Sequence, residues 1–358
     1  MKSFFFILII VSLTGIFCNK KTSDSDVTPP PRDTTHSPAD TTKNPADTTT
    51  AFFAKGADVS WTSEMEAQNI KFYSRSGAGE DIFQVLKEEG INSIRLRAWV
   101  HPADGYNNTN DVVAKAMRAK NAGMKIMIDL HYSDTWADPG HQTKPAAWST
   151  PDINALKDSV YNYTVSVMNA LKAQNIYPDW VQVGNETDNG MLWPDGRADS
   201  AMNNFAAFVT AGYNAVKSVS DSSQVIVHIS NGYDNNLFRW VFDGLKSNGA
   251  KWDIIGMSLY PTASNWNTYD IECQNNMSDM AARYNKPVMI CEAGMSWTDS
   301  TACNLFLKDI ISKTKAVSNN QGLGVFYWEP EAYANWQGYT LGAFDNSGKP
   351  TVALDAFK

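Results

Sequence analysis

Basic residues are scarce in this chain of 358 residues, and no segment concentrates them. The 30 Lys and Arg residues are outnumbered by 38 Asp and Glu residues, and the formal net charge is −8. Nucleic-acid phosphates are bound by clustered Lys and Arg, so this pattern argues against a nucleic-acid partner. After the first residues there is also no apolar run long enough to span a bilayer, which argues against a membrane-spanning domain.

Cysteine is equally scarce, and the four residues present follow no metal-binding spacing. Neither Cys-x-x-Cys nor His-x-x-x-His occurs, so we expect no metal site and no cofactor. In an oxidising compartment two of the three downstream cysteines could pair. Cys291 adjoins Glu292 on a predicted strand, and alternation would turn its side chain away from whatever Glu292 faces. We therefore expect Cys273 and Cys303 to be the pair.

The first 51 residues divide into two segments of different composition. Residues 1–18 contain Lys2, an apolar run and a terminal Cys18, which is typical of a secretory signal peptide. The position of Cys18 favours lipid modification over plain cleavage, so we expect a secreted protein held at the outer membrane or cell surface by this anchor alone. Residues 19–51, rich in Thr, Pro and Asp, predict a disordered tether because they bury too little apolar surface to offset chain entropy.

From residue 52 to residue 358, apolar runs of strand length alternate with segments of helical pattern. The predicted strands are 53–59, 93–100, 125–132, 180–186, 224–230, 254–260, 287–292 and 323–329. Eight such runs, each followed by a helix-sized segment, predict an α/β fold, a single (β/α)8 TIM barrel. An open doubly wound sheet would need a glycine-rich phosphate loop after its first strand, and residues 56–60 do not supply one.

Polar and aromatic side chains collect where the predicted strands end. In chain order they are Asp58, Arg95, Arg97, His131, Asp134, Trp136, Asn185, Glu186, Tyr260, Glu292, Trp328 and Glu329. The carboxyl ends of barrel strands form the active face of this fold. We therefore expect these side chains to meet around one pocket.

Two of these strand ends carry a glutamate, which suits hydrolysis of a glycosidic bond. A retaining glycosidase needs one protonated carboxyl, which donates to the leaving oxygen, and one carboxylate, which attacks the anomeric carbon. Glu186 and Glu292 end strands on opposite sides of the expected barrel and can fill these roles. Asn185 can donate to the sugar 2-hydroxyl, while Arg95 and Tyr260 can keep Glu292 ionised.

Several longer strings resemble the endo-β-1,4-galactanases of glycoside hydrolase family 53, within the clan of retaining (β/α)8 glycosidases. They are GADVS at 56–60, RLRAWV at 95–100, DLHYSDTWADP at 129–139, VGNET at 183–187 and GVFYWEP at 324–330. The resemblance runs from about residue 53 to the end, and the string at 129–139 is specific to the family. It implies an endo-galactanase acting on the β-1,4-galactan side chains of pectin, with Glu186 as acid/base and Glu292 as nucleophile.

The resemblance also implies which residues surround the substrate. They are Asp58, Arg95, His131, Asn185, Tyr260 and Trp328, with Trp99 and Trp136 as stacking platforms farther along the groove. Asp134, at the end of the third strand, is a further substrate-binding candidate. Bacterial members often hold calcium between long loops after the last two strands. Here residues 296–300 lead straight into a helix and residues 331–342 are few, so we do not expect calcium.

Two other interpretations stay open at the level of sequence. A sister glycosidase of the clan, acting on β-mannan or β-glucan, would share the fold and both acids. A non-catalytic glycan-binding protein could use the same barrel and tether, although the presence of both acids with their supporting residues argues against it. In either case we expect a monomer whose partner is a polysaccharide.

Overall fold

The computed structural model describes residues 52–149 and 152–358. The expected signal peptide, lipidated Cys18 and tether of residues 1–51 lie outside the described residues. Among the described residues, none of the helices has the length and apolarity needed to cross a membrane.

Eight parallel strands close into a barrel, in the order β1-β10-β9-β8-β7-β4-β3-β2. They are β1 (Ala54–Asp58), β2 (Ser93–Ala98), β3 (Lys125–Leu130), β4 (Trp180–Val183), β7 (Gln224–Ile229), β8 (Ile254–Leu259), β9 (Val288–Ala293) and β10 (Gly322–Trp328). All eight predicted strands are present, and the predicted (β/α)8 barrel is confirmed. The short strands β5 (Gly190–Met191) and β6 (Gly196–Arg197) form a separate antiparallel pair after β4.

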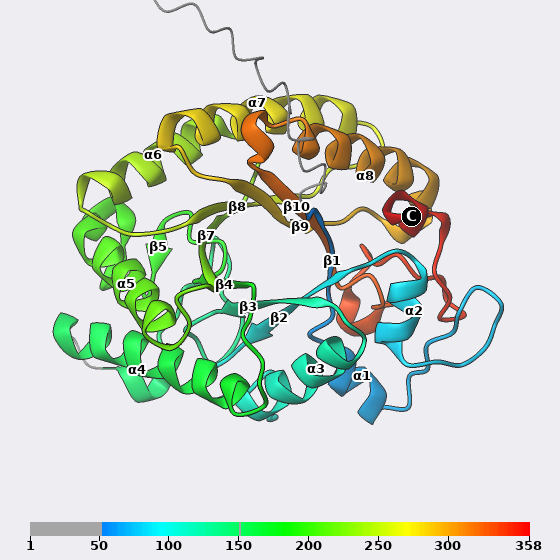
Figure 1. Ribbon diagram of the computed structural model, residues 1–358, viewed down its shortest axis with the longest axis horizontal. Helices are drawn as coiled ribbons and strands as arrows, with labels where there is room; N and C mark the ends of the chain where they lie inside the picture. Colours follow the sequence, from blue (N-terminus) through cyan, green and yellow to red (C-terminus); the bar gives the residue numbers. More distant parts are fainter. Residues whose placement is uncertain (1–51, 150–151) are drawn as a thin grey trace, which may run out of the picture. The chain divides into compact units, whose positions relative to one another are not determined.

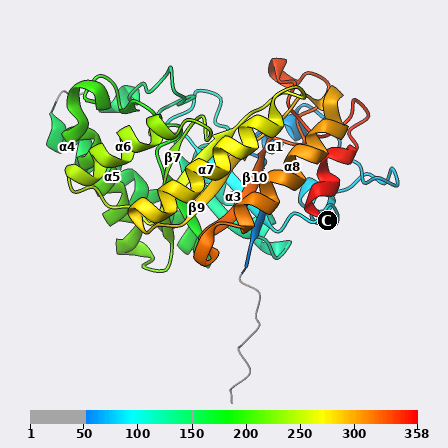
Figure 2. The same cartoon turned by 90° about the horizontal axis from the view of Figure 1, so that it is seen from above.

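Helices surround the barrel and cover its outer face (Figure 1). They are α1 (Thr62–Ala67), α2 (Ile82–Glu88), α3 (Thr109–Asn121), α4 (Ile153–Lys172), α5 (Ala198–Val219), α6 (Asn235–Ser247), α7 (Trp266–Tyr284) and α8 (Ser300–Lys315). Figure 2 shows α7 and α8 side by side along one flank. Several helices begin directly after a side chain that accepts a hydrogen bond from their first turn, as Asp81, Asn108 and Asp234 do.

Side chains alternate between the barrel interior and the helix-covered face, as the pleat of a strand requires. Below the mouth the interior of the barrel is apolar and contains Ala54, Met127, Trp180, Ile226, Ile254, Met289, Cys291 and Phe326. Gly56 leaves room for the ring of Phe326, since a Cβ there would lie 2.0 Å from it. Toward the carboxyl ends the inward positions become polar, with Arg95, Asp129, Gln182 and His228 all buried.

The structure contradicts the expected disulfide between Cys273 and Cys303. Cys273, Cys291 and Cys303, the cysteines of the described residues, are buried free thiols. Cys273 on α7 lies against Gly232 after β7, whereas Cys303 on α8 has its Sγ 3.7 Å from the hydroxyl of Tyr327 on β10. Each thiol packs under its own helix, so two cysteines near helix starts are not brought together.

Candidate active site

A pocket of about 300 Å³ opens at the carboxyl ends of the barrel strands. Its lining consists of His131, Trp136, Ala137, Asp138, Asn185, Glu186, Tyr260, Glu292, Trp328, Tyr339 and Leu341. The closed barrel thus brings together two glutamates that are 106 positions apart in the sequence, 292 − 186. Aromatic rings line the pocket alongside the two carboxyl groups, a lining that suits a sugar with apolar ring faces and hydroxyl edges.

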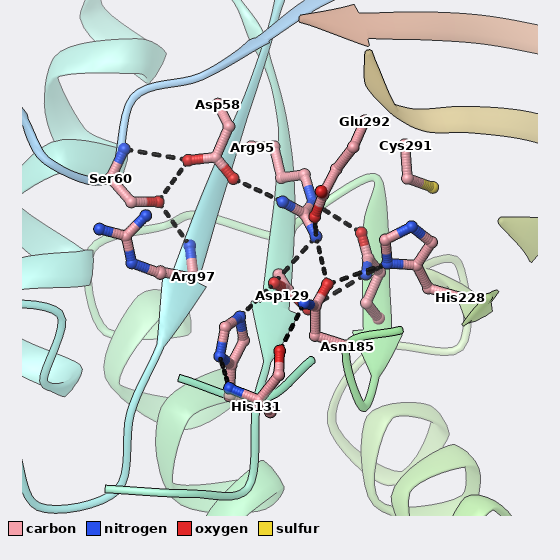
Figure 3. A network of polar contacts seen from close by, with 12 residues as sticks. Asp58, Ser60, Arg95, Arg97, Asp129, His131, Asn185, His228, Cys291 and Glu292 are labelled. Atoms are coloured by element: carbon pink, nitrogen blue, oxygen red, sulfur yellow. Dashed lines mark hydrogen bonds and ion pairs between the residues drawn. The ribbon is translucent and has the colours of Figure 1, made fainter. Parts of the chain in front are cut away.

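Glu292 enters this pocket because of a β-bulge in β9. Ile290 pairs with Met257 on β8, but the next pair joins Glu292 to Ser258, so Cys291 is an extra residue on its strand. Cys291 and Glu292 consequently both face the interior (Figure 3). The alternation argument, which turned Cys291 away from Glu292, was therefore wrong. A bulge re-aims one side chain without ending the strand, which here places the carboxylate at the mouth.

The Glu292 carboxylate is held by one cation and one hydroxyl. Arg95 Nη2 lies 2.8 Å from its Oε1, and the Tyr260 hydroxyl donates to its Oε2 at 2.7 Å. Burial raises the pKa of Glu292, while Arg95 and Tyr260 oppose that rise by stabilising the charged form. Both oxygens therefore have fixed partners, and the carboxylate has a defined orientation in the pocket.

Glu186 stands in a different electrostatic environment. Burial raises its pKa well above the usual range, and the negative charge of Glu292 adds to this effect. The positive charge of Arg95 acts in the opposite direction, but its effect on the pKa is weaker than those of burial and of Glu292. Of the two acids, Glu186 is the one that keeps its proton to higher pH. Its backbone adopts φ of +42°, rare for a non-glycine residue, and Gln142 supports this turn by donating to the carbonyl of Asn185 at 2.8 Å.

Arg95 lies beneath the pocket and is the hub of a buried network (Figure 3). Its guanidinium donates at 2.7 to 2.9 Å to Asp58 Oδ2, Asp129 Oδ2, Gln182 Oε1 and Asn185 Oδ1, in addition to the ion pair with Glu292. Asp58 is fully buried and also accepts from the backbone and hydroxyl of Ser60. Arg95 thus contacts Glu292 and Asn185 of the pocket lining, and Asp58 contacts Arg95, but neither Asp58 nor Arg95 lines the pocket itself.

Trp99 and Asp134 also lie outside the lining of the pocket. The indole N–H of Trp99 donates to His131 Nδ1 at 3.1 Å, and the ring packs edge-on against Trp136. Asp134 accepts hydrogen bonds from the backbone N–H groups of His101 and Ala146, which braces the loop after β3. Trp136, by contrast, lines the pocket directly.

Six residues of the site and its support were not singled out from the sequence. Asp138 and Tyr339 line the pocket, while Asp129, Gln182, His228 and Ser258 form the layer beneath it. The buried four stand at inward positions of otherwise apolar strands, and that alternation is the signal that could have identified them. Within the described ranges 52–149 and 152–358, no group of three or more His, Cys, Asp or Glu side chains is arranged to hold a metal ion.

Comparison with known proteins gives a consistent result. Residues 54–357 match the model of glycosyl hydrolase family 53. An arabinogalactan endo-β-1,4-galactanase of Thermothelomyces thermophilus is 32% identical, covering 84% of this chain and 98% of that protein. A probable arabinogalactan endo-β-1,4-galactanase A of Aspergillus fumigatus is 35% identical, covering 77% of this chain and 83% of that protein.

Solved structures agree with the sequence relatives. A fungal β-1,4-galactanase structure superposes with a TM-score of 0.80 at 30% identity, covering 86% of this chain and 99% of that one. The family 53 catalytic domain of Ignisphaera aggregans gives 0.78 at 28% identity, with 88% and 98% covered. An exo-β-1,4-mannosidase of an Opitutaceae bacterium, at 16% identity and a TM-score of 0.62, covers 86% of this chain and 58% of that one and shares the fold alone.

Proposed function

Because the chain belongs to glycosyl hydrolase family 53, and is a glycoside hydrolase of the endo-β-1,4-galactanase type, we propose that it cleaves the β-1,4-galactan side chains of pectin by a two-glutamate double displacement. The observation that carries this proposal is the unequal treatment of two carboxyl groups in one pocket. Arg95 and Tyr260 hold Glu292 as a carboxylate, while burial and the charge of Glu292 keep Glu186 protonated.

In the first step the Glu292 carboxylate attacks the anomeric carbon of the galactosyl unit. Glu186 gives its proton to the glycosidic oxygen as the bond from that oxygen to the anomeric carbon breaks. The shortened chain leaves with a new hydroxyl group, and the sugar is bound to Glu292 as an ester. Glu186 is then a carboxylate.

In the second step Glu186 acts as a base. The ester at Glu292 carries no charge, so the repulsion that helped to raise the pKa of Glu186 is absent. Glu186 accepts a proton from water while that water attacks the anomeric carbon, and Glu292 leaves as a carboxylate. Two inversions at the same carbon give a product with the β configuration, and the enzyme returns to its starting protonation state.

Several groups are available to hold the sugar during these steps. The Asn185 amide spends one N–H on the carbonyl of Ala137 at 2.8 Å, which leaves its second N–H for a sugar hydroxyl. Trp136, Trp328 and Tyr339 line the pocket and offer faces on which the apolar side of a galactose ring can stack. Arg95 and Asp58 act from below by fixing the orientations of Glu292 and Asn185.

The mechanism is tested with Glu186→Gln and Glu292→Gln on purified potato galactan. Both variants should bind galactan while kcat falls by about three orders of magnitude or more. NMR of the earliest product should show the β-anomer. An α-anomer formed first would overturn the double displacement. Turnover retained in Glu292→Gln would overturn the role of that residue.

The substrate is tested separately, by measuring oligosaccharides released from galactan, β-mannan and cellulose under identical conditions. We expect release from galactan. Release confined to mannan or cellulose would favour a sister activity of the clan while leaving both acids in their roles, because those acids are shared across the clan.

We also propose that the enzyme acts as a monomer anchored through a lipid on Cys18, at the cell surface or outer membrane. The support is the sequence pattern of residues 1–18. Labelling of cells with a palmitate analogue should mark the wild-type protein but not Cys18→Ser. Equal labelling of the two would remove the anchor, and light scattering of the soluble domain would test the monomer.

A further inference from the structure

Two buried residues connect the carboxyl group of Glu186 with the interior of the barrel. Ser258 on β8 is near enough to Glu186 for its hydroxyl to lower the pKa of that carboxyl by hydrogen bonding. The Oγ of Ser258 also lies 2.8 Å from Nε2 of His228 on β7. Ser258 is 1% exposed and His228 is 0% exposed, and neither lines the pocket. They can affect the reaction through Glu186 but not by direct contact with the substrate, because they do not line the pocket that would hold it.

His228 is an uncharged imidazole in this position. Burial lowers its pKa well below the usual value, and the nearby guanidinium of Arg95 adds to this effect. Its Nδ1 lies 3.0 Å from Gln182 Nε2 and 2.9 Å from Asn185 Oδ1, one donor and one acceptor. Nδ1 therefore has a hydrogen-bond partner in either neutral tautomer. Among the described residues the nearby carboxylate is that of Asp129, whose charge opposes the lowering of the His228 pKa without a hydrogen bond to the ring.

The amide groups around the ring are fixed by Arg95. Gln182 accepts from Arg95 Nε through its Oε1 at 2.7 Å, so its NH2 end must face Asp129 and His228. Asn185 accepts from Arg95 through its Oδ1 at 2.9 Å. Since Arg only donates, neither amide can turn over, and the ring of His228 is held between them with its Nε2 toward Ser258.

A hydroxyl suits a carboxyl group that must be an acid in one step and a base in the next. The Ser258 hydroxyl can accept a hydrogen bond from protonated Glu186 and can rotate to donate one to the carboxylate. A fixed cation at this position would favour the ionised form only. A backbone carbonyl would favour the protonated form only.

We propose that Ser258, held in place by the neutral side chain of His228, is a positioning residue that supports Glu186 in both of its protonation states. This inference rests on the proposed acid/base role of Glu186. It predicts that the Ser258 hydroxyl sets the pH range over which the enzyme works, because a hydrogen bond to the charged carboxylate is stronger than one to the neutral acid.

Other charges around Glu186 are unchanged by a substitution at Ser258. Those that face it are Glu292 and Asp188, which raise its pKa, and Arg95, which lowers it. The phenol of Tyr260 is also close enough to interact with it. Truncation of the serine to alanine adds and removes no charge, so a shift in the pH profile reports the lost hydrogen bond.

The test is the pH dependence of kcat/KM on galactan for Ser258→Ala. Loss of a hydrogen bond to the carboxylate should move the alkaline limb upward by about one pH unit. Ser258→Cys keeps the size of the side chain and weakens the hydrogen-bond donor, so it should shift the alkaline limb less. This variant replaces Ser258→Ala in the test if the alanine variant does not fold. His228→Gln, which is neutral, should move the limb less than Ser258→Ala.

Ser93→Ala is the matched control. Ser93 is a fully buried serine on β2 whose hydroxyl donates to Asn92 at 2.8 Å, remote from Glu186. It should leave the pH profile in place even if the protein loses stability. If Ser258→Ala lowers activity equally at all pH values, as a merely structural residue would, the inference is overturned.

Failure of the acid role of Glu186 itself is detected with a different substrate. In an aryl β-galactobioside made from a strongly acidic phenol, the phenolate can leave without taking up a proton. The alkaline limb of wild-type kcat/KM should therefore disappear with this substrate. A limb that persists with this substrate belongs to some group other than the acid and would contradict the role of Glu186. A limb that disappears, together with an unshifted profile for Ser258→Ala on galactan, would contradict the role of Ser258 alone.

Discussion

Arg95 and Arg97 stand two residues apart on β2, both buried, and their surroundings are different. Arg95 contacts the carboxylates of Asp58, Asp129 and Glu292 and two side-chain amides. Arg97 pairs with a single carboxylate, that of Glu329. Instead of further acceptors, three indole rings surround the Arg97 guanidinium. The centroids of the Trp61, Trp99 and Trp136 rings lie 5.1, 5.3 and 4.3 Å from its carbon.

The difference separates two ways to bury a guanidinium. Hydrogen bonds to several acceptors fix the orientation of Arg95 and of each group that it contacts, which suits the nucleophile role proposed for Glu292. Nε and Nη2 of Arg97 have no hydrogen-bond partner among the described residues. Contact with the faces of the three indole rings therefore takes the place of hydrogen bonds at these two nitrogens. Cation–π attraction depends less on direction. Arg97 is therefore suited to holding the aromatic side of the pocket, through Trp136.

The two surroundings also differ in how they titrate. Burial would raise the pKa of Asp129, but the charge of Arg95 holds it below the usual value. Burial raises the pKa of Glu329 to about 7 despite Arg97, and raises that of the neighbouring Glu331 well above its usual range. The Arg97 cluster can therefore take up protons near neutral pH, whereas Asp129 in the Arg95 cluster cannot.

The largest expected effect comes from substitution of Arg95. Arg95→Met leaves three buried carboxylates without their cation, and breaking such a buried pair costs about 3–5 kcal/mol. Arg95→Lys keeps the charge but lacks the planar set of donors, so we expect it to fold and to lose kcat by about 100-fold or more. Urea unfolding and galactan kinetics measure these effects. A lysine variant with nearly normal kcat would remove the distinction between the two arginines.

A smaller effect is expected for Arg97→Met. Glu329 can accept a proton once its cation is removed, so the cost is limited to about 2 kcal/mol from the lost cation–π and ionic contacts. Because Trp136 is less firmly held, KM for galactan should rise about threefold to tenfold while kcat changes little. A loss of kcat comparable with that of Arg95→Lys would show that Arg97 has a more direct part in catalysis.

The third prediction concerns pH and stability. The folded-state pKa of Glu329, about 7, lies above its ordinary value, so the folded state binds more protons than the unfolded state between these values. The stability that this contributes is complete below about pH 4.5 and is lost as the pH rises toward 7. In Glu329→Gln, the loss in the free energy of unfolding between about pH 4.5 and pH 7 should be smaller than in the wild type by about 1–3 kcal/mol.

Thermal melts from pH 5 to pH 7.5 provide the measurement for Glu329→Gln. Glu88→Gln, on the exposed face of α2, is the control for loss of a carboxylate and should keep the wild-type slope. A Glu329→Gln variant that also keeps that slope would place the proton uptake elsewhere in the protein.

The smallest expected effect is that of Trp99→Phe. This change removes the hydrogen bond to His131 but leaves an aromatic ring beside Arg97. The cost should be about 1 kcal/mol, and KM should change by about twofold. Trp136→Phe, which alters the pocket lining itself, should raise KM more. If the order of the two variants were reversed, Trp99 would have to contact the substrate.

Most of the framework could be predicted from the sequence because it depends on local patterns. Continuous apolar runs such as residues 288–291 mark strands that are buried on both faces, and a carboxylate directly after such a run, here Glu292, marks the carboxyl end of the strand. Glu186 and Glu292 could therefore be assigned to one pocket once a barrel was inferred. The family-specific string at 129–139 narrowed the function further.

Depth within the barrel could not be predicted in the same way. Asp58 and Trp328 are Cα partners on neighbouring strands, yet Trp328 lines the pocket and Asp58 is buried below it. Which of two neighbours reaches the mouth depends on strand stagger and on how far each side chain extends. Alternation along apolar strands can show that His228 and Ser258 face inward, but it cannot show that the two side chains lie 2.8 Å apart beneath the pocket.

The sequence by itself determined the order of strands and helices, the two acids at strand ends and the family, since each of these follows from residue type and spacing. Tertiary structure alone decided that the bulge at Cys291 turns Glu292 inward, and that Cys273 and Cys303 remain apart. It also decided that Arg95 is surrounded by carboxylates and Arg97 by indoles. These outcomes depend on contacts between strands far apart in the chain, and only closure of the barrel creates them.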